Sequence, residues 1–401
     1  MRMTFNRSSQ LVLVSAVSLL AAGLLTACGT LTVDFVYVTS AVAAGPNSYG
    51  EVDVFEVNSE SGKMRQIPTS PFPSGGRNPV AEVTSPDNAD LYVVNRDDNS
   101  IVQFVIGTDG KLYPQNTVNT PGVFPLAVTT AGNFLVVADT FQPLPTCSPA
   151  APCSGSVAVF PIGAANVLGA PAENSSISAA YWPLALPSAP THVLMPTAVA
   201  SAASGAYVYV TAYDTSVAPT VGYVFGFGLN SDGTLNPLNS GVPFAAGRQP
   251  SAIASGGNAI YVTDFANNNV LAYAINGGLL TPVAGSPFPA GNAPAAIVVD
   301  KTASFVYVAN SVDSNLTAYT TAGGVLTPVG SFVTGTQPVA VGIDPSLNQY
   351  MYTANFLGNT VTGFQINATS GTLLNSQFSP YRANANPTAV AAIPHGNQPK
   401  Q

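Results

Sequence analysis

The sequence of this 401-residue chain predicts an all-β fold, a seven-bladed β-propeller built from four-stranded blades. The composition is that of a turn-rich β protein, because 46% of the residues are hydrophobic, only 7% are charged, and Gly and Pro number 36 and 34. A strand signal also occurs seven times at intervals of 44 to 73 residues, a repeat length typical of propeller blades. The seven signals are Tyr37-Val38, Tyr92-Val93, Val136-Val137, Tyr209-Val210, Tyr261-Val262, Tyr307-Val308 and Tyr352-Thr353.

Three further anchors in each repeat predict the other strands. A proline before a small or apolar run predicts the first strand, because proline has no N–H for a ladder and fits best where a strand begins. These prolines are Pro79, Pro125, Pro196, Pro250, Pro294, Pro338 and Pro387. The Tyr-Val signal is then the second strand, and an aromatic residue marks the third, at Phe55, Phe104, Phe160, Phe227, Tyr273, Tyr319 and Phe364. Pairs such as Asp109-Gly110 supply the positive φ of a tight turn before a short fourth strand.

The order of these anchors predicts how the ring closes. The chain begins near Phe35 with a second strand and ends with a first strand over residues 387–393. The last strand therefore completes the blade that the first strands begin, which removes the open edges of a broken ring. We expect one propeller domain over residues 35–394 and a tail over residues 395–401.

Residues 1–27 have the pattern of an export signal. Arg2 and Arg7 precede a fifteen-residue apolar run, 11–25, which is too short to span a bilayer comfortably. Leu25-Thr26-Ala27-Cys28 resembles the bacterial lipobox, which implies lipidation of Cys28 and a short tether over residues 28–34. We therefore expect an exported protein anchored by lipid in the cell envelope, in the outer membrane because Gly29 is not acidic. The alternative is an ordinary secretory signal with a chance cysteine.

Charge and cysteine content limit the partners. Without residues 1–27 the chain has nine basic and nineteen acidic residues, and this net charge near −10 argues against nucleic-acid binding. Cys147 and Cys153 remain, and in an exported protein we expect them to form a disulfide. A metal pair is the rival interpretation, but two cysteines do not complete a site and no histidine is nearby in sequence. We expect no metal and no cofactor.

The predicted strand order places the longer connections on one face, around the mouth of the central channel. These are the connections from second to third strand and from fourth to first strand, and function tends to lie on such loops. A polar residue recurs where the second strand ends, and the set is Ser40, Asn95, Asp139, Asp264, Asn310 and Asn355, with Ala212 in the fourth repeat. One interpretation is that these side chains cap their own turns, and the other is a ring of acceptors for a ligand, with Asn95, Asn310 and Asn355 as contacts.

Four of the five arginines after residue 27 fall on this predicted mouth face. Arg77 and Arg248 occupy the same repeat position, two residues before the strand-starting proline, while Arg96 follows Asn95 and Arg382 lies in the last loop. In a chain so poor in cations this clustering indicates recognition of a carboxylate, a phosphate or a polyol. The alternative is that each arginine pairs with a neighbouring acid.

Catalytic signals are sparse. His192 lies on the predicted mouth face, and with Asp139 and Asp264 it is a candidate acid or base, although an isolated histidine is more often structural. No serine triad spacing, zinc helix or phosphate loop is visible. Aromatic residues in the insertions, among them Phe141 and Trp182, are candidates for ligand stacking or for plugging the channel.

Segments such as Phe305-Val306-Tyr307-Val308-Ala309-Asn310 resemble the YVTN-type repeat and the lactonase family of seven-bladed propellers, which includes 6-phosphogluconolactonase-like enzymes. The resemblance covers roughly residues 35–394. It implies hydrolysis of a sugar lactone, with an acid or histidine as base and Arg77 or Arg248 holding the substrate.

Two functions therefore stay open. One is a monomeric, lipid-anchored propeller that binds a sugar-like ligand or a protein partner, or acts as a scaffold, at the cell envelope. The other is an exported lactone hydrolase. Convergence of Arg77, Arg248 and an acid would favour the enzyme, and arginines already paired with acids would favour the binding protein.

Overall fold

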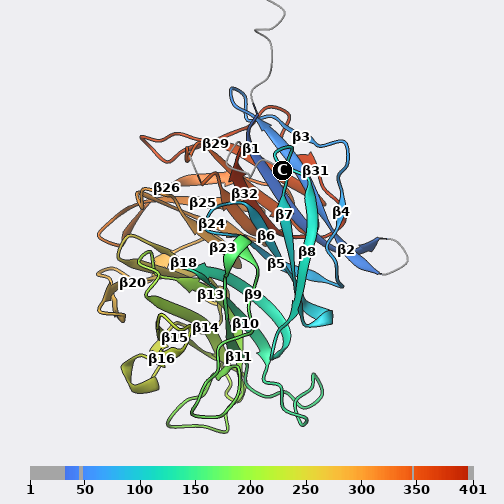
Figure 1. Cartoon of the computed structure of the whole chain (residues 1–401). Coiled ribbons are helices and arrows are strands. Elements are labelled where there is room, and N and C mark those ends of the chain that lie inside the picture. The colour runs from blue at the N-terminus through green and yellow to red at the C-terminus, as the bar shows by residue number, and fades with distance from the viewer. Residues whose placement is uncertain (1–31, 45–47, 346, 396–401) are drawn as a thin grey trace, which may run out of the picture.

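The computed structural model describes residues 32–44, 48–345 and 347–395, and it confirms the predicted seven-bladed propeller (Figure 1). Seven antiparallel sheets of four strands stand in a ring, and in four of them a short fifth strand pairs with the third. We number the blades 1 to 7 and count the strands of each blade outward from the axis. The export signal and Cys28 lie outside the described residues.

Blades 1 to 4 come from the first part of the chain and from its last strand. Blade 1 consists of β32 (Pro387–Pro394), β1 (Thr32–Ala44), β2 (Tyr49–Asn58) and β3 (Met64–Gln66), with β4 (Phe72–Pro73) beside β2. Blade 2 consists of β5 (Pro79–Thr84), β6 (Asp90–Asn95), β7 (Ser100–Ile106) and β8 (Leu112–Asn119). Blade 3 consists of β9 (Val123–Ala131), β10 (Phe134–Phe141), β11 (Ser156–Pro161) and β12 (Trp182–Pro183). Blade 4 consists of β13 (Leu194–Ser201), β14 (Tyr207–Asp214), β15 (Val221–Leu229) and β16 (Leu235–Pro237), with β17 (Phe244–Ala245) beside β15.

Blades 5 to 7 follow in sequence order. Blade 5 consists of β18 (Pro250–Gly256), β19 (Ala259–Asp264), β20 (Asn269–Asn276) and β21 (Leu279–Pro282), with β22 (Phe288–Pro289) beside β20. Blade 6 consists of β23 (Pro294–Val299), β24 (Phe305–Asn310), β25 (Asn315–Ala322) and β26 (Val325–Val333). Blade 7 consists of β27 (Pro338–Ile343), β28 (Tyr350–Asn355), β29 (Thr360–Ile366) and β30 (Leu373–Asn375), with β31 (Tyr381–Arg382) beside β29.

The helices of the described chain are three single turns of 3-10 helix: η1 (Arg96–Asp98), η2 (Ala164–Asn166) and η3 (Asn239–Gly241). In the described residues no helix is long and apolar enough to cross a membrane.

The first strands of neighbouring blades stand side by side and form the wall of the central channel. Each of them contains one of the predicted prolines, and a β-bulge follows that proline in every blade. A bulge bends a strand and increases its twist, so this shared irregularity turns all seven strands in the same way where they start at the mouth. The ring closes as predicted, because β32 pairs with β1 over Asp34–Ser40, and Figure 1 shows the red last strand beside the blue first one.

The tyrosines of the repeated signal hold neighbouring blades together. Tyr37, Tyr209 and Tyr307 are fully buried. Each hydroxyl donates to the carbonyl of a turn glycine in the following blade, at Gly110, Gly278 and Gly371, over 2.9 to 3.1 Å. A buried hydroxyl needs such a partner, and the glycine allows the close approach of the turn. The Tyr-Val repeat is therefore a contact between blades as well as a strand signal.

Candidate functional site

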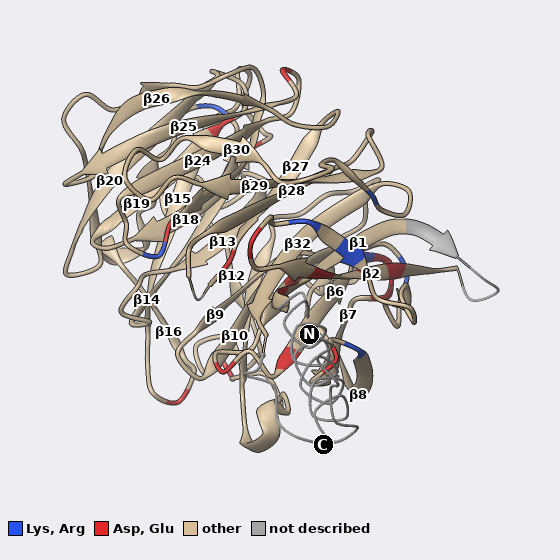
Figure 2. Cartoon of the chain, turned by 90° about the horizontal axis from the view of Figure 1, so that it is seen from above, with Lys and Arg blue, Asp and Glu red and all other residues tan. Residues whose placement is uncertain are grey.

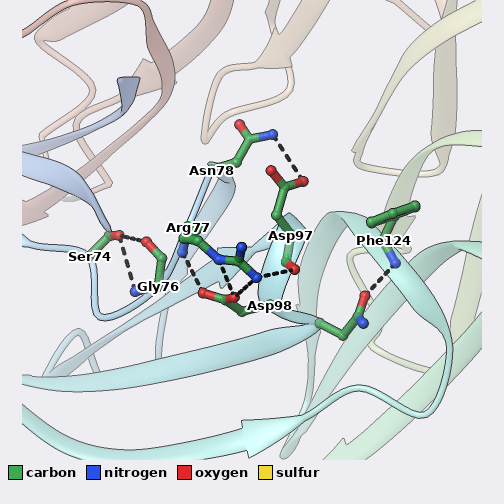
Figure 3. A network of polar contacts seen from close by, with 8 residues as sticks. Ser74, Gly76, Arg77, Asn78, Asp97, Asp98 and Phe124 are labelled. Carbon is green, nitrogen blue, oxygen red and sulfur yellow. Dashed lines mark hydrogen bonds and ion pairs between the residues drawn. The ribbon is translucent and has the colours of Figure 1, made fainter. Parts of the chain in front are cut away.

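The second-to-third and fourth-to-first connections meet on one face, as the sequence predicts. Arg77, just before β5, contacts Asp98 in η1, just after β6, and Figure 3 shows this part of the mouth. Lys, Arg, Asp and Glu occupy few positions along the chain, as the blue and red parts of the ribbon in Figure 2 show. The polar contacts of the mouth are therefore few, and their geometry differs from one arginine to the next.

Arg77 is engaged by the protein itself. Its Nε and Nη2 lie 2.6 and 2.5 Å from Asp98 Oδ1, and its backbone N–H donates to Asp98 Oδ2 over 2.7 Å. These contacts raise the pKa of Arg77, and they lower the pKa of Asp98 although burial acts in the opposite direction. The arrangement fixes the loop before β5, and it is the acid-paired alternative that the sequence left open.

Arg96 lies over an aromatic ring instead of an acid. Its guanidinium carbon is 5.1 Å from the centre of the Phe124 ring, within the range of a cation–π contact. Phe124 has a φ of 56°, which is unusual for a bulky residue, and its N–H donates to Asn99 Oδ1 over 2.7 Å (Figure 3). Phe141 packs against the same ring edge-on.

Arg248 and Arg382 are the mouth arginines whose side chains bond no polar group of the described chain. Both are exposed, and in the described part of the chain neither guanidinium has a polar partner. The backbone N–H of Arg248 donates to Asp264 Oδ2 over 2.8 Å, which holds the residue in place and leaves its side chain available.

The polar residues at the ends of the second strands hold the mouth loops. Asn95, Asn310, Asn355 and Asp264 are fully buried. Asn95 donates to the carbonyl of Ser74, and Asn310 accepts from the N–H of Gly291. Asn355 donates to the hydroxyls of Thr360 and Thr362, while Asp264 accepts from the N–H groups of Arg248, Gln249 and Ala266. This geometry supports the turn-capping interpretation, and a direct ligand contact by these residues stays a prediction.

Asp139 is sealed beneath the mouth. It is fully buried, and neither carboxylate oxygen has a hydrogen bond of normal geometry. Burial raises the pKa of Asp139 to about 7, with Thr120 and the backbone of Gly122 offsetting part of the rise. A Cβ placed on Gly122 would lie 2.4 Å from Asp139 Cβ, so the loop covers this carboxyl closely.

His192 forms a dyad with an acid that the sequence analysis did not single out. His192 Nδ1 lies 2.6 Å from Asp214 Oδ2, and the second oxygen, Oδ1, accepts from the N–H of Ser216 over 2.8 Å. The Asp214 side chain is 2% exposed and that of His192 is 32% exposed. The carboxylate therefore holds Nδ1 and orients the ring, while the imidazole remains accessible to solvent.

The dyad belongs to blade 4, and Arg248 stands where the chain passes from blade 4 to blade 5. His192 leads into β13, Asp214 ends β14, and Arg248 follows β17. Arg248 leads into β18, the neighbour of β13 in the channel wall, and its backbone N–H is bonded by Asp264 at the end of β19. Arg77 belongs to blade 2, so Arg77 and Arg248 stand on separate parts of the ring.

Comparison with known proteins gives the family. Residues 48–141 and 255–391, more than half of the chain, match the family described as Lactonase, 7-bladed beta-propeller. The chain belongs to this lactonase family. No curated protein matched it. The gap in the match covers residues 142–254, which include His192, Asp214 and Arg248.

Solved structures of this lactonase fold are similar at low sequence identity. A Bacteroides fragilis protein described as a candidate 6-phosphogluconolactonase is 19% identical, with a TM-score of 0.70, 91% of this chain and 99% of that chain covered. The periplasmic gluconolactonase PpgL of Pseudomonas aeruginosa is 19% identical, with a TM-score of 0.69, 90% of this chain and 99% of that chain covered. At this identity the similarity establishes the fold alone.

One signal for Asp214 was present in the sequence of this lactonase-family chain. The fourth repeat has Ala212 where other repeats end their second strand with Asn or Asp, and the acid stands two residues later. Side chains two apart on a strand point to the same side, so the displaced acid still faces the mouth loops. Two aromatic candidates are part of the packing: Trp182 is 5% exposed in the core between blades 3 and 4, and Phe141 is also 5% exposed. Cys147 and Cys153 are joined in the loop between β10 and β11.

Proposed function

We propose that this protein hydrolyses a sugar-type lactone at the mouth edge of blade 4, while anchored by lipid in the cell envelope. The observation that carries the proposal is the His192–Asp214 dyad, a solvent-accessible imidazole oriented by a buried carboxylate. Membership of the lactonase family and the Pseudomonas gluconolactonase structure support the reaction class. The lipobox-like sequence at Cys28 supports the location.

The dyad can act as a general base and then as an acid. Nδ1–H of the neutral ring donates a hydrogen bond to Asp214 Oδ2, which leaves the Nε2 lone pair to take a proton from water. The resulting hydroxide attacks the lactone carbonyl, and the carbonyl oxygen becomes an oxyanion. When the ring C–O bond breaks, the leaving alkoxide takes the proton back from His192, and the product is a hydroxy acid.

Arg248 is the group we assign to the developing negative charge and to an anionic or polyol substituent of the substrate. It is exposed and unpaired in the described part of the chain, and Asp264 of the neighbouring blade 5 holds its backbone on the mouth face. Arg77 is occupied by Asp98, so its role in this proposal is to fix a loop.

The test is pH-stat hydrolysis of a panel of sugar lactones by protein that starts after Cys28. We expect His192→Ala to lower kcat about 10²–10⁴-fold, the usual contribution of a general base. Asp214→Asn should also lower kcat and should change its pH profile, because the carboxylate no longer orients the ring. Arg248→Ala should act mainly on kcat/KM.

Two matched controls lie away from blade 4. His395 contacts the Phe35 ring in a tilted arrangement, and Arg65 pairs with Glu56 on blade 1. His395→Ala and Arg65→Ala should keep full turnover. Equal activity of the His192→Ala and His395→Ala variants would contradict the assignment.

A second candidate function follows from the Arg77–Asp98 pair. If the mouth arginines chiefly build structure, the protein is a binding or scaffold propeller at the envelope. Folded protein that turns over no lactone of the panel, yet binds an acidic sugar or a protein partner through Arg248 or Arg382, would establish that function.

A further inference from the structure

We propose that the face opposite the mouth, along blades 7 and 1, rests on the surface of a lipid bilayer. This inference rests on the lipid anchor at Cys28 that forms part of the proposed function. It adds which surface meets the membrane and which side chains enter it.

The first strand of the chain enters the propeller on the side opposite the mouth, and this position indicates which face lies near the lipid. Strand β1 begins at Thr32, four residues after Cys28. Four residues span at most about 14 Å when fully extended. Thr32 pairs with Asn58, whereas Ser40, farther along β1, pairs with Glu51 at the mouth end of the blade. A lipid on Cys28 therefore brings the Thr32 side of the ring close to the headgroups.

Large apolar side chains are exposed on blade 7, next to this point. Phe378 is 69% exposed, Leu374 68% and Leu347 55%, values that are high for their residue types. The backbone of this segment contacts blade 1, because the N–H of Gln377 donates to the carbonyl of Ser61. Phe378 therefore borders the blade into which the anchored segment leads, whereas the turn of Leu347 contacts blade 6, because Asn348 donates to Asp300 Oδ2 over 2.9 Å.

Cations accompany the apolar side chains. Lys63 Nζ lies 5.0 Å from the centre of the Phe378 ring. Lys63 also lines a cavity of about 420 Å³ together with Thr32, Gln377 and Glu60, and with Arg65, which pairs there with Glu56. Phe and Leu side chains beside a lysine are typical of surfaces that lie in the bilayer interface, where the apolar groups enter the headgroup–acyl boundary and the ammonium group reaches phosphate.

Phe378 lies on the outer edge of blade 7, where Ser376 and Ser379 on either side of it both bond Gly363 of β29. The Phe378 φ of 69° is left-handed, a conformation that costs energy for a bulky residue and that tends to be retained at functional contacts. Leu357, Val312 and Val333 are also exposed, but they lie at the mouth ends of blades 6 and 7, away from the Thr32 side. With the Thr32 side on the bilayer, the mouth and the His192–Asp214 dyad open toward water.

The test compares two tryptophan variants of the full lipidated protein in phosphatidylcholine vesicles with brominated acyl chains. Phe378→Trp probes the proposed contact, and Leu357→Trp, at a residue 61% exposed on the mouth face, is the matched control. The native Trp182 is 5% exposed and contributes the same background to both. Mass spectrometry verifies the lipid on Cys28, and lactone turnover in the same vesicles reports the proposed reaction separately.

We expect bromolipid to quench the emission of Phe378→Trp and to leave Leu357→Trp at the level of the parent. Emission of Phe378→Trp should also shift to the blue relative to the same variant lacking the lipid. Equal quenching of both variants, quenching of Leu357→Trp alone, no quenching with a lipidated Cys28, or absence of the lipid would each overturn the proposal.

Discussion

At the scale of single residues, Glu82 is the position where the chain departs most from its own repeat. It occupies the third position after the proline in a first strand, where the other blades have Val128, Val199, Ile253, Ile297, Val341 and Val390. The residue as a whole is half-buried, but both carboxylate oxygens are shielded and lack a hydrogen bond of normal geometry. Burial raises the pKa of Glu82 to about 8, although the backbone of Ala391 and Thr39 lowers it in part.

Replacing Glu82 with the repeat residue should stabilise the protein. We expect Glu82→Val to raise the free energy of unfolding at pH 7 by about 1–3 kcal/mol, the cost of a buried polar group without a partner. Urea unfolding followed by fluorescence measures the change. Val128→Ala in blade 3 serves as the control for an ordinary loss of packing and should destabilise.

Glu82 also makes the stability of the protein depend on pH, and its raised pKa fixes the direction of that dependence. Because the folded-state pKa of Glu82 lies above its unfolded value, the folded protein binds more protons between about pH 4.5 and pH 8. Stability should therefore fall as the pH rises through this window. Asp34, Asp53 and Asp139 also have raised pKa values, so Glu82→Val should reduce the slope without removing it. An unchanged slope would contradict the assigned pKa.

At the scale of elements, the turn between third and fourth strand joins blades 2, 5 and 7 to the blade before each of them, through a tyrosine hydroxyl of that blade. Gly277 and Gly278 form this turn in blade 5, and both have positive φ, 57° and 84°. A Cβ on Gly278 would lie 2.6 Å from the Tyr207 ring, whereas one on Gly277 would meet nothing within 4 Å. A side chain at Gly277 would therefore meet backbone strain alone, whereas one at Gly278 would meet backbone strain and a steric clash.

Alanine at these two positions should have unequal effects. We expect Gly277→Ala to cost about 1 kcal/mol, because left-handed backbone is unfavourable for a residue with a Cβ. Gly278→Ala should cost clearly more, since the turn must also move away from Tyr207 and from the Tyr209 hydroxyl that donates to Gly278. Thermal unfolding of the two variants measures the difference, and equal melting temperatures would count against this role of the turn.

At the scale of the whole molecule, the ring stays closed through the non-covalent pairing of the first and last strands in blade 1. Strand β32 covers Val36, Tyr37 and Val38 of β1, all fully buried. A ring that lacks β32 would expose this apolar strand together with its unpaired edge.

Truncation tests the closure. A chain that ends at Asn386 should fail to give soluble monomer, because the free edge of β1 would pair with other chains. Size-exclusion chromatography would show aggregates, or no soluble protein. A chain that ends at His395 is the control and should elute as the full chain does.

The fold could be predicted almost completely from the sequence, because each blade repeats four local signals. The tyrosine, the third-strand aromatic, the turn glycine and the strand-starting proline all depend on neighbours at fixed offsets. The fifth strands β4, β17, β22 and β31 were not predicted, since two-residue strands have no period to detect.

The site was less predictable, because its contacts join loops that follow no repeat. Arg77 and Asp98 are 21 residues apart, as their contact shows, and nothing in the sequence distinguishes Asp98 from Asp97 as the partner. His192 and Asp214 come from an insertion and from a displaced strand end. Whether an arginine is paired or free depends on these loop paths, which only the three-dimensional structure provides.

The closure of blade 1 also sets an order in time. The first strands to be synthesised, β1 and β2, have to wait for β32, the last, before their blade is complete. If the chain is exported from its N-terminus, blade 1 stays unfinished until the final residues have crossed the membrane. A product shortened by proteolysis or by early termination would then keep an open ring, which quality-control proteases could recognise. Only a full-length chain can close blade 1.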